Sequence, residues 1–219
     1  MTFLASVLAG AIFLTGVCSA SATTLTWTDA TPATATDWTD TFSGTKFNSA
    51  LGTLNSVDVY LWGNVTGNLK FTNNSNNSKN YSQATLGTDL TLQLPSALFL
   101  TVQAVHSYTP NILVPKLSTV TSDIFNAASS TTQSYSDLAT LSAFTGTGNI
   151  DLLVESMGFA GYLGSSNLTV ESFSDSAASI QVTYDYTPTP PPIATPEPST
   201  LMLLGGSLVG LAFWRRRKQ

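Results

Sequence analysis

The stretch SVDVYLWGNV, residues 56–65, decides the fold class of this 219-residue chain. The aliphatic residues Val57, Val59 and Leu61 alternate along it with the acidic or aromatic residues Asp58, Tyr60 and Trp62. Successive side chains of a β-strand point to opposite faces of its sheet, so a period of two predicts a strand with one buried face.

The same alternation recurs at regular spacing on both sides of this stretch. It returns in residues 88–105, 149–156, 167–173 and 179–188, and Pro95 interrupts the first of these runs. Short alternating strands between turn residues predict an all-β body at residues 23–187, an antiparallel β-sandwich of jelly-roll-like form. The Asn/Ser cluster within residues 68–82 is expected to form a long polar loop, and residues 136–144 a short helix capped by Ser136 or Asp137.

The charge of the body excludes one class of partner. Between residues 23 and 187 the chain has four lysines, no arginine and 12 acidic residues. Nucleic-acid phosphates are bound mainly through Lys and Arg, so no nucleic acid is expected as a partner.

The N-terminal segment has the features of a secretory signal peptide, residues 1–22. Its apolar run ends at Ala20-Ser21-Ala22, a small-x-small pattern that predicts cleavage after Ala22. No Lys or Arg precedes the run, and a buried N-terminal helix is the alternative. The expected partners are the secretion translocon and signal peptidase. The sole cysteine, Cys18, lies in this leader, so a disulfide within the body is excluded.

The C-terminal segment combines a short apolar run with the only basic cluster of the chain. Residues 201–214 carry no charge and predict a helix of about 21 Å, short of a hydrocarbon core of about 30 Å. With interfacial Trp214 and snorkelling arginines it is expected to act as a single transmembrane helix with its tail in the cytoplasm. The membrane-facing residues are Leu201, Leu203, Leu204, Leu208, Val209, Leu211, Phe213 and Trp214, and the stop-transfer residues are Arg215, Arg216, Arg217 and Lys218.

Three ordered elements in residues 196–219 resemble a PEP-CTERM sorting signal. They are Pro196-Glu197-Pro198, the short apolar helix, and the terminal basic block, preceded by a proline-rich linker at residues 188–195. The resemblance implies recognition and cleavage by an exosortase, a membrane-embedded cysteine protease-transpeptidase. The precursor would then sit briefly in the inner membrane before delivery to the cell surface or extracellular matrix. A permanent single-span anchor is the alternative.

Two stretches and the end of the body resemble the choice-of-anchor E domain, an extracellular β-rich module. They are KFNSALGTLNSVDVYL at residues 46–61, LATLSAFTGTGNIDLLV at 138–154, and the closing VTYDYTP at 182–188. The resemblance implies no activity. Gly146 and Gly148 have a physical reading of their own, because they permit a tight turn between the short helix and the next strand.

The body offers few residues for chemistry. His106 is the only histidine and is expected at the surface or a sheet edge, while Asp37 with Asp40 and Asp151 with Glu155 are pairs of carboxylates. We expect no catalytic residue, cofactor or metal, and therefore a non-catalytic exported protein. The alternatives are a carbohydrate-binding module that contacts exopolysaccharide and, with less support, a secreted hydrolase. An aromatic platform for sugar rings would use Trp27, Trp38, Tyr60 and Trp62.

Overall fold

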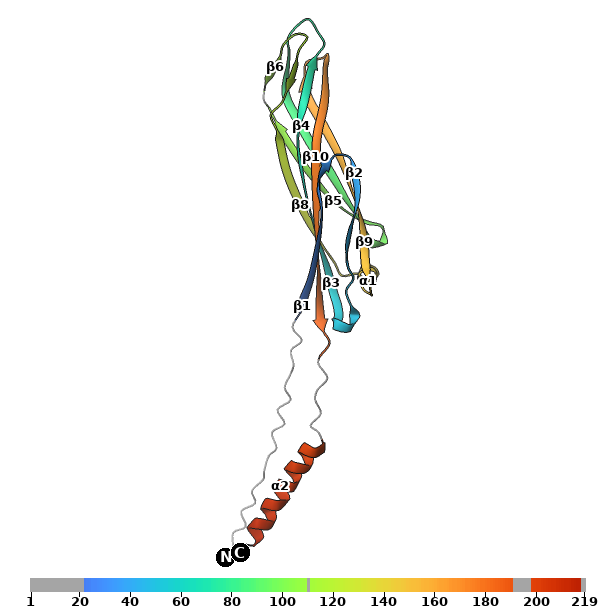
Figure 1. Cartoon of the computed structure of the whole chain (residues 1–219), viewed down its shortest axis with the longest axis vertical. Coiled ribbons are helices and arrows are strands. Elements are labelled where there is room, and N and C mark those ends of the chain that lie inside the picture. Colours follow the sequence, from blue (N-terminus) through green and yellow to red (C-terminus); the bar gives the residue numbers. More distant parts are fainter. Residues whose placement is uncertain (1–21, 110, 191–197, 218–219) are drawn as a thin grey trace, which may run out of the picture. The chain divides into compact units, whose positions relative to one another are not determined.

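The computed structural model describes residues 22–109, 111–190 and 198–217. These residues form two units, with the boundary between Pro188 and Thr189. The first unit is an all-β sandwich elongated along its strands, and the second contains one helix (Figure 1). The predicted antiparallel β-sandwich is therefore confirmed.

The sandwich consists of two antiparallel sheets of five strands each. The first sheet has the order β1-β10-β3-β7, with β8 also paired to β3, and comprises β1 (Thr23–Ala35), β3 (Gly52–Asn73), β7 (Thr119–Thr121), β8 (Phe125–Tyr135) and β10 (Leu168–Pro188). The second has the order β2-β9-β4-β5, with β6 also paired to β4, and comprises β2 (Trp38–Thr45), β4 (Lys79–Leu94), β5 (Leu98–Tyr108), β6 (Ile112–Val114) and β9 (Asn149–Gly164).

Strand β3 shows how the alternating pattern produces this architecture. Val57, Val59 and Leu61 are fully buried, whereas the residues between them are partly or fully exposed. Tyr60 lies opposite Gln181 of β10 on one side and Thr132 of β8 on the other. Because directly paired residues share a face, the inner and outer faces of the whole sheet follow from this one strand.

Two apolar clusters fill the space between the sheets. The larger one contains Val57, Val59 and Leu61 of β3 together with Leu90 and Leu92 of β4. The smaller one lies further along the strands and contains Leu69, Phe71, Tyr81, Ala84, Leu86, Val114, Phe125 and Leu168. The stacked rings of Phe71 and Tyr81, 3.8 Å between centroids, join the two sheets there.

A chain of buried hydroxyls links the sheets as well. The Trp38 indole N–H donates to Ser176 Oγ at 2.8 Å, Ser176 Oγ lies 2.6 Å from Ser156 Oγ, and Ser156 Oγ lies 2.8 Å from Thr88 Oγ1. The Thr88 hydroxyl donates onward to the Met157 carbonyl at 3.3 Å. The hydroxyls of Ser176, Ser156 and Thr88 can therefore each accept one hydrogen bond and donate another, as buried polar groups require.

The polar loop expected from the Asn/Ser cluster within residues 68–82 is found, but it is short. Strand β3 continues to Asn73 and β4 begins at Lys79, so the connection between them is five residues long, Asn74–Ser78. Leu69, Phe71 and Tyr81, on either side of this connection, point inward and are fully buried. The buried Asn73 side chain donates to the carbonyls of Asn77, Val114 and Pro115, which satisfies its amide group.

The predicted short helix is confirmed as α1, Leu138–Phe144. Asp137 is its N-cap and accepts a hydrogen bond from the Thr140 amide at 2.9 Å. The hydrogen bond from the Thr140 amide lowers the pKa of the Asp137 carboxyl. Gly146 and Gly148 then take φ angles of 144° and 91°, which side chains disfavour, and turn the chain into β9. The expected break at Pro95 is also found, as the 3-10 turn η2 (Pro95–Ala97) between β4 and β5.

Three stretches that are far apart in the sequence meet in one aromatic cluster beside α1. The Phe47 amide donates to the Phe144 carbonyl at 2.8 Å, and the Gly146 amide donates to the Phe47 carbonyl at 2.9 Å. The Phe47 and Phe144 rings lie edge-on to Tyr184, with centroids 5.9 and 6.3 Å away. The 3-10 turn η1 (Ser49–Leu51) follows Phe47 and leads into β3. Residues 46–61, 138–154 and 182–188 thus each contribute one ring to this cluster.

Candidate functional site

The second unit contains helix α2, Pro198–Arg216. Pro198 opens the helix, a position that suits proline because its missing N–H would have no intrahelical partner there. Pro196, Glu197 and Lys218 lie outside the described residues, as does Ala20 of the expected signal-peptide cleavage site. Ala22 is the first described residue and is exposed ahead of β1.

Helix α2 consists of an apolar segment followed by a basic C-terminal end. Leu203, Leu204, Leu208, Val209, Leu211, Phe213 and Trp214 are all exposed, whereas the side chain of Leu201 is not among those described. Arg215 and Arg216 occupy the last turn and Arg217 follows it. Positive side chains at a helix C-terminus are favoured by the helix dipole, so the basic block also stabilises the end of α2.

The expected single transmembrane helix is not found. Among the described helices, none is both long and apolar enough to cross a bilayer. In α2 the uncharged segment is short, three glycines interrupt it, and Pro198, Ser199 and Thr200 precede it while arginines follow it. The expected N-terminal signal helix lies outside the described residues.

His106 lies on β5, an edge strand of its sheet, as the sequence predicts. Its ring packs edge-on to Phe125 at 5.5 Å between centroids. With Tyr108, Asp123 and Ile124 the two rings line a hollow of about 220 Å³. Within residues 22–109, 111–190 and 198–217, no three His, Cys, Asp or Glu side chains gather as a metal site would require.

Three of the four carboxylates that sequence singled out accept hydrogen bonds from the protein. Asp40 accepts from the Thr31 hydroxyl at 2.6 Å and the Thr41 amide at 2.8 Å, and these two bonds lower the pKa of its carboxyl. Asp37 accepts from the Gly158 amide at 2.6 Å. Asp151 accepts from the Ser43 hydroxyl at 2.7 Å.

The second carboxylate pair lies along one strand. Asp151 and Glu155 share the outer face of β9 and are four residues apart. Their Cα atoms are therefore about 13 Å from each other along the strand.

The four residues considered for an aromatic platform do not lie together. Trp27 and Trp38 pack against the larger core cluster, and their indole N–H groups donate to Tyr184 and Ser176 inside the sandwich. A Cβ at Gly44 would collide with the Trp27 ring, so glycine is required where that ring crosses β2. Only Tyr60 and Trp62 remain outside, on the outer face of β3.

The outer face of the first sheet is a polar surface four strands wide around Tyr60. Strands β1, β10, β3 and β8 place three rows of outward residues there: Thr26, Thr183, Asp58, Ser134; Thr28, Gln181, Tyr60, Thr132; and Ala30, Ser179, Trp62, Ser130. We call these residues the Tyr60 face. The Thr26 and Thr183 hydroxyls lie 3.1 Å apart across β1 and β10.

Two shallow hollows lie on either side of Tyr60. One, of about 340 Å³, is lined by Thr28, Asp29, Ala30, Tyr60, Ser179, Ile180 and Gln181. The other, of about 350 Å³, is lined by Asp58, Tyr60, Thr132, Gln181 and Thr183. Tyr60 and Gln181 are common to both, so this directly paired couple forms the ridge between the hollows. Sequence periodicity could place Tyr60 outside, but only the strand pairing could place Gln181 beside it.

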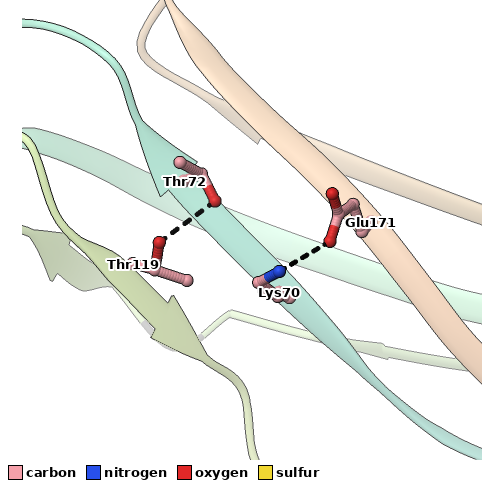
Figure 2. A network of polar contacts seen from close by, with 4 residues as sticks. All are labelled: Lys70, Thr72, Thr119 and Glu171. Carbon is pink, nitrogen blue, oxygen red and sulfur yellow. Dashed lines mark hydrogen bonds and ion pairs between the residues drawn. The ribbon is translucent and has the colours of Figure 1, made fainter.

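The same outer surface carries an ion pair further along β3. Lys70 Nζ of β3 lies 2.9 Å from Glu171 Oε2 of β10, and the hydroxyls of Thr72 of β3 and Thr119 of β7 lie 3.2 Å apart. Figure 2 shows both contacts. Both charged side chains are about half exposed, at 41% and 51%. An exposed pair of this kind contributes about 0–1 kcal/mol to stability.

Comparisons with known proteins give one informative match. No curated protein matches the chain. Among solved structures, Desmodium yellow mottle tymovirus is 9% identical, with 88% of this chain and 96% of that chain covered and a TM-score of 0.21. Infectious bursal disease virus Gt strain is 13% identical, with 86% of this chain and 49% of that chain covered and a TM-score of 0.12. Scores this low carry no argument about fold or function.

The C-terminal residues match a known protein-sorting motif. Residues 194–218 match the PEP-CTERM protein-sorting motif. The matched region contains Pro196-Glu197-Pro198, the apolar segment of α2 and the basic block. The chain therefore carries a PEP-CTERM sorting motif, and this motif supports an exported surface protein that is processed by an exosortase.

Proposed function

We propose that this chain is a non-catalytic surface or extracellular-matrix protein, exported through the translocon and held briefly at the inner membrane before exosortase cleavage. The match of residues 194–218 to the sorting motif carries the proposal. The exposed apolar side chains of α2 support a transient membrane stage, because such a surface is poorly accommodated in water. The basic block then keeps the C-terminus on the cytoplasmic side.

Processing at both ends is tested by the mass of the mature protein. Signal peptidase removes residues 1–22, and the exosortase cuts near Pro196-Glu197-Pro198 and removes the basic tail. Intact-mass measurement on protein extracted from the cell surface is expected to show both losses. Deleting the exosortase gene in the same strain is the control, and it should restore only the C-terminal mass. Recovery of the full chain from Met1 to Gln219 at the surface of the parent strain contradicts the proposal.

The non-catalytic role rests on how the polar residues of the body are used. Asp40 and Asp151 accept hydrogen bonds from neighbouring hydroxyls, and the Cα atoms of Asp151 and Glu155 lie about 13 Å apart along β9. A secreted hydrolase is therefore the weaker alternative. Screening the surface-extracted protein for hydrolase activity tests it, and any turnover that His106→Ala abolishes overturns the non-catalytic role.

The choice-of-anchor E assignment for residues 23–187 is part of the same proposal. Its support is the convergence of the three resembling segments on Phe47, Phe144 and Tyr184. A choice-of-anchor E domain is defined by its sequence pattern and its mode of anchoring, and it implies no activity. A structural role for this body agrees with that definition.

A carbohydrate-binding module is the second candidate function. The observation that favours it is the exposure of Tyr60 among hydroxyl and amide side chains on the outer face of the first sheet. This function is compatible with export and does not depend on exosortase cleavage. Binding of the purified chain to polysaccharides tests it.

A further inference from the structure

We propose that the Tyr60 face binds a neutral polysaccharide, with the polymer lying across the ridge formed by Tyr60 and Gln181. This inference deepens the second candidate function by naming its site and ligand class. The ridge and its two hollows carry the argument, because they place an aromatic ring and hydrogen-bonding groups within reach of one extended ligand.

The chemistry of the face matches that of a sugar polymer. Tyr60 offers a ring against which the apolar face of a sugar can pack, and its hydroxyl group remains available for hydrogen bonds. Gln181 provides an amide donor and acceptor beside that ring, and Thr28 and Thr132 provide hydroxyls in the same row. A ligand rich in hydroxyl groups can pair with every one of these side chains.

The charge of the face selects a neutral polymer. Asp58 is an outward residue of the face, Asp29 lines one hollow, and no Lys or Arg lies among the face residues or the hollow linings. A polyanionic glycan would meet repulsion without a compensating cation, whereas neutral sugar hydroxyls can donate to the carboxylates. A protein partner is disfavoured for a different reason, because such interfaces have an apolar core that this face lacks.

The dimensions favour a polymer over a single sugar. Neighbouring strands lie about 4.8 Å apart, so the row from β1 to β8 extends over about 14 Å. The hollows on both sides of the ridge make two adjacent positions for successive sugar residues. Both are shallow, which suits an extended chain that enters and leaves along the surface.

Binding is tested with the purified full-length chain in detergent micelles, by affinity electrophoresis in gels containing one polysaccharide each. The neutral probes are dextran, mannan, galactan and mixed-linkage β-glucan, and the anionic probes are alginate and heparin. We expect retardation by at least one neutral polymer and by neither anionic one. Because the assay needs no export or cleavage, failure here leaves the sorting proposal untouched, and failure of cleavage in cells leaves this one untouched.

The site is tested with variants on the ridge. Tyr60→Ala is expected to weaken binding at least about tenfold, as loss of a central aromatic contact does, and Gln181→Ala to weaken it by a smaller factor. Tyr60→Phe keeps the ring and should retain most of the affinity. The matched control is Phe99→Ala, which removes an exposed ring from β5 of the other sheet and should leave binding unchanged.

Trp62 gives an independent readout, because it lies on the same face two residues along β3 from Tyr60. Ligand addition should change the tryptophan fluorescence, and Trp62→Phe should remove most of that change. Equal melting temperatures of Tyr60→Ala and the parent chain establish that the variant is folded. The proposal is overturned if no neutral polymer retards the chain, if the anionic polymers bind better, or if folded Tyr60→Ala binds as tightly as the parent.

Discussion

Two buried tyrosines of the sandwich differ in how their hydroxyl groups are satisfied. The Tyr184 hydroxyl accepts from the Trp27 indole at 3.1 Å and donates to the Thr45 carbonyl at 2.9 Å. The Tyr81 hydroxyl is buried and has no hydrogen-bond partner among the described residues. The Tyr108 hydroxyl nearby is likewise unpaired, so the two do not meet at hydrogen-bonding geometry.

This difference predicts that replacing tyrosine with phenylalanine changes the free energy of unfolding differently at the two positions. Tyr184→Phe leaves the Trp27 N–H and the Thr45 carbonyl without their partner and should lower the free energy of unfolding by about 1–3 kcal/mol. Tyr81→Phe removes only an unpaired hydroxyl from the core and should be neutral or slightly stabilising. Urea unfolding of both variants and the parent measures this, and a larger loss for Tyr81→Phe would contradict the structure.

The same tyrosines predict how stability depends on alkaline pH. Burial raises the pKa of Tyr81, and burial also raises the pKa values of Tyr135 and Tyr184. For Tyr81 the proximity of Tyr108 is a secondary cause. In the unfolded chain these groups ionise near pH 10, whereas the folded chain holds them neutral to higher pH. Their contribution is therefore fully present below about pH 10 and is lost as pH rises further, through the folded pKa values.

Urea midpoints measured at pH 8 and pH 11 are expected to show this loss. Tyr81→Phe should reduce the difference between the two midpoints, because one ionising group with a raised pKa has been removed. An unchanged difference would mean that Tyr81 ionises as readily in the folded chain as in the unfolded one.

At the scale of elements, the hydroxyl chain ties β2, β4, β9 and β10 together between the two core clusters. Ser156 is its central member, since its hydroxyl contacts both Ser176 and Thr88. Ser156→Ala would leave two buried hydroxyls without that contact and should lower the free energy of unfolding by about 1–3 kcal/mol. Ser134→Ala, on the exposed surface of β8, is the control and should change stability by less than about 0.5 kcal/mol. Similar losses of unfolding free energy for both variants would show that the buried hydroxyl chain contributes no specific stability.

The long sides of the sandwich are closed by contacts between edge strands. On one side β1 and β2 are joined through Thr31 with Asp40 and through Asp29 with the Ser43 amide at 2.9 Å. On the other side β5 and β8 lie in contact. Exposed strand edges promote pairing between molecules, so this closure leaves the broad faces as the accessible surfaces of the body.

At the scale of the whole molecule, no disulfide constrains the body. The only cysteine is Cys18, ahead of the first strand, so the sandwich is held by its two core clusters and strand pairing. Reducing agent is expected to leave the melting temperature of the surface-extracted protein unchanged, as differential scanning calorimetry would measure. A lowered melting temperature would mean that the extracted protein still carries Cys18 and that a disulfide through it contributes.

The basic block is predicted to retain the precursor during export. The apolar segment of α2 is short and contains Gly205, Gly206 and Gly210, each costing about 1 kcal/mol of helix propensity relative to Ala. Such a segment holds the membrane weakly, so the four terminal charges must supply much of the retention. Replacing Arg215, Arg216, Arg217 and Lys218 with Asn should release unprocessed protein, with α2 still attached, into the periplasm or medium.

Fractionation followed by mass measurement detects this release. Replacing Lys46 and Lys116 of the body with Asn is the matched control and should leave retention and cleavage normal. If the tail variant is retained and cut at the parental rate, the basic block is not the retention signal.

The sequence by itself determined the local features of this protein. Alternation in residues 56–65 identified the buried and exposed faces of β3, because strand geometry couples side-chain direction to position along the chain. Asp137 and the following apolar residues identified α1, because a capping hydrogen bond is a local event. The sorting motif in residues 194–218 was also legible, because an enzyme that reads a peptide requires contiguous residues.

Only the tertiary structure decided which segments meet. Periodicity cannot tell that Thr23 pairs with Tyr186 at the other end of the body, or that Gln181 lies beside Tyr60, because pairing partners are chosen by packing over long separations. For the same reason the Asn/Ser cluster within residues 68–82 could not show how short its loop is. Burial of Leu69, Phe71 and Tyr81, with the amide of Asn73 satisfied by three carbonyls, makes most of that segment strand. The free energy that fixes such contacts belongs to the assembled sandwich and to no single stretch of the chain.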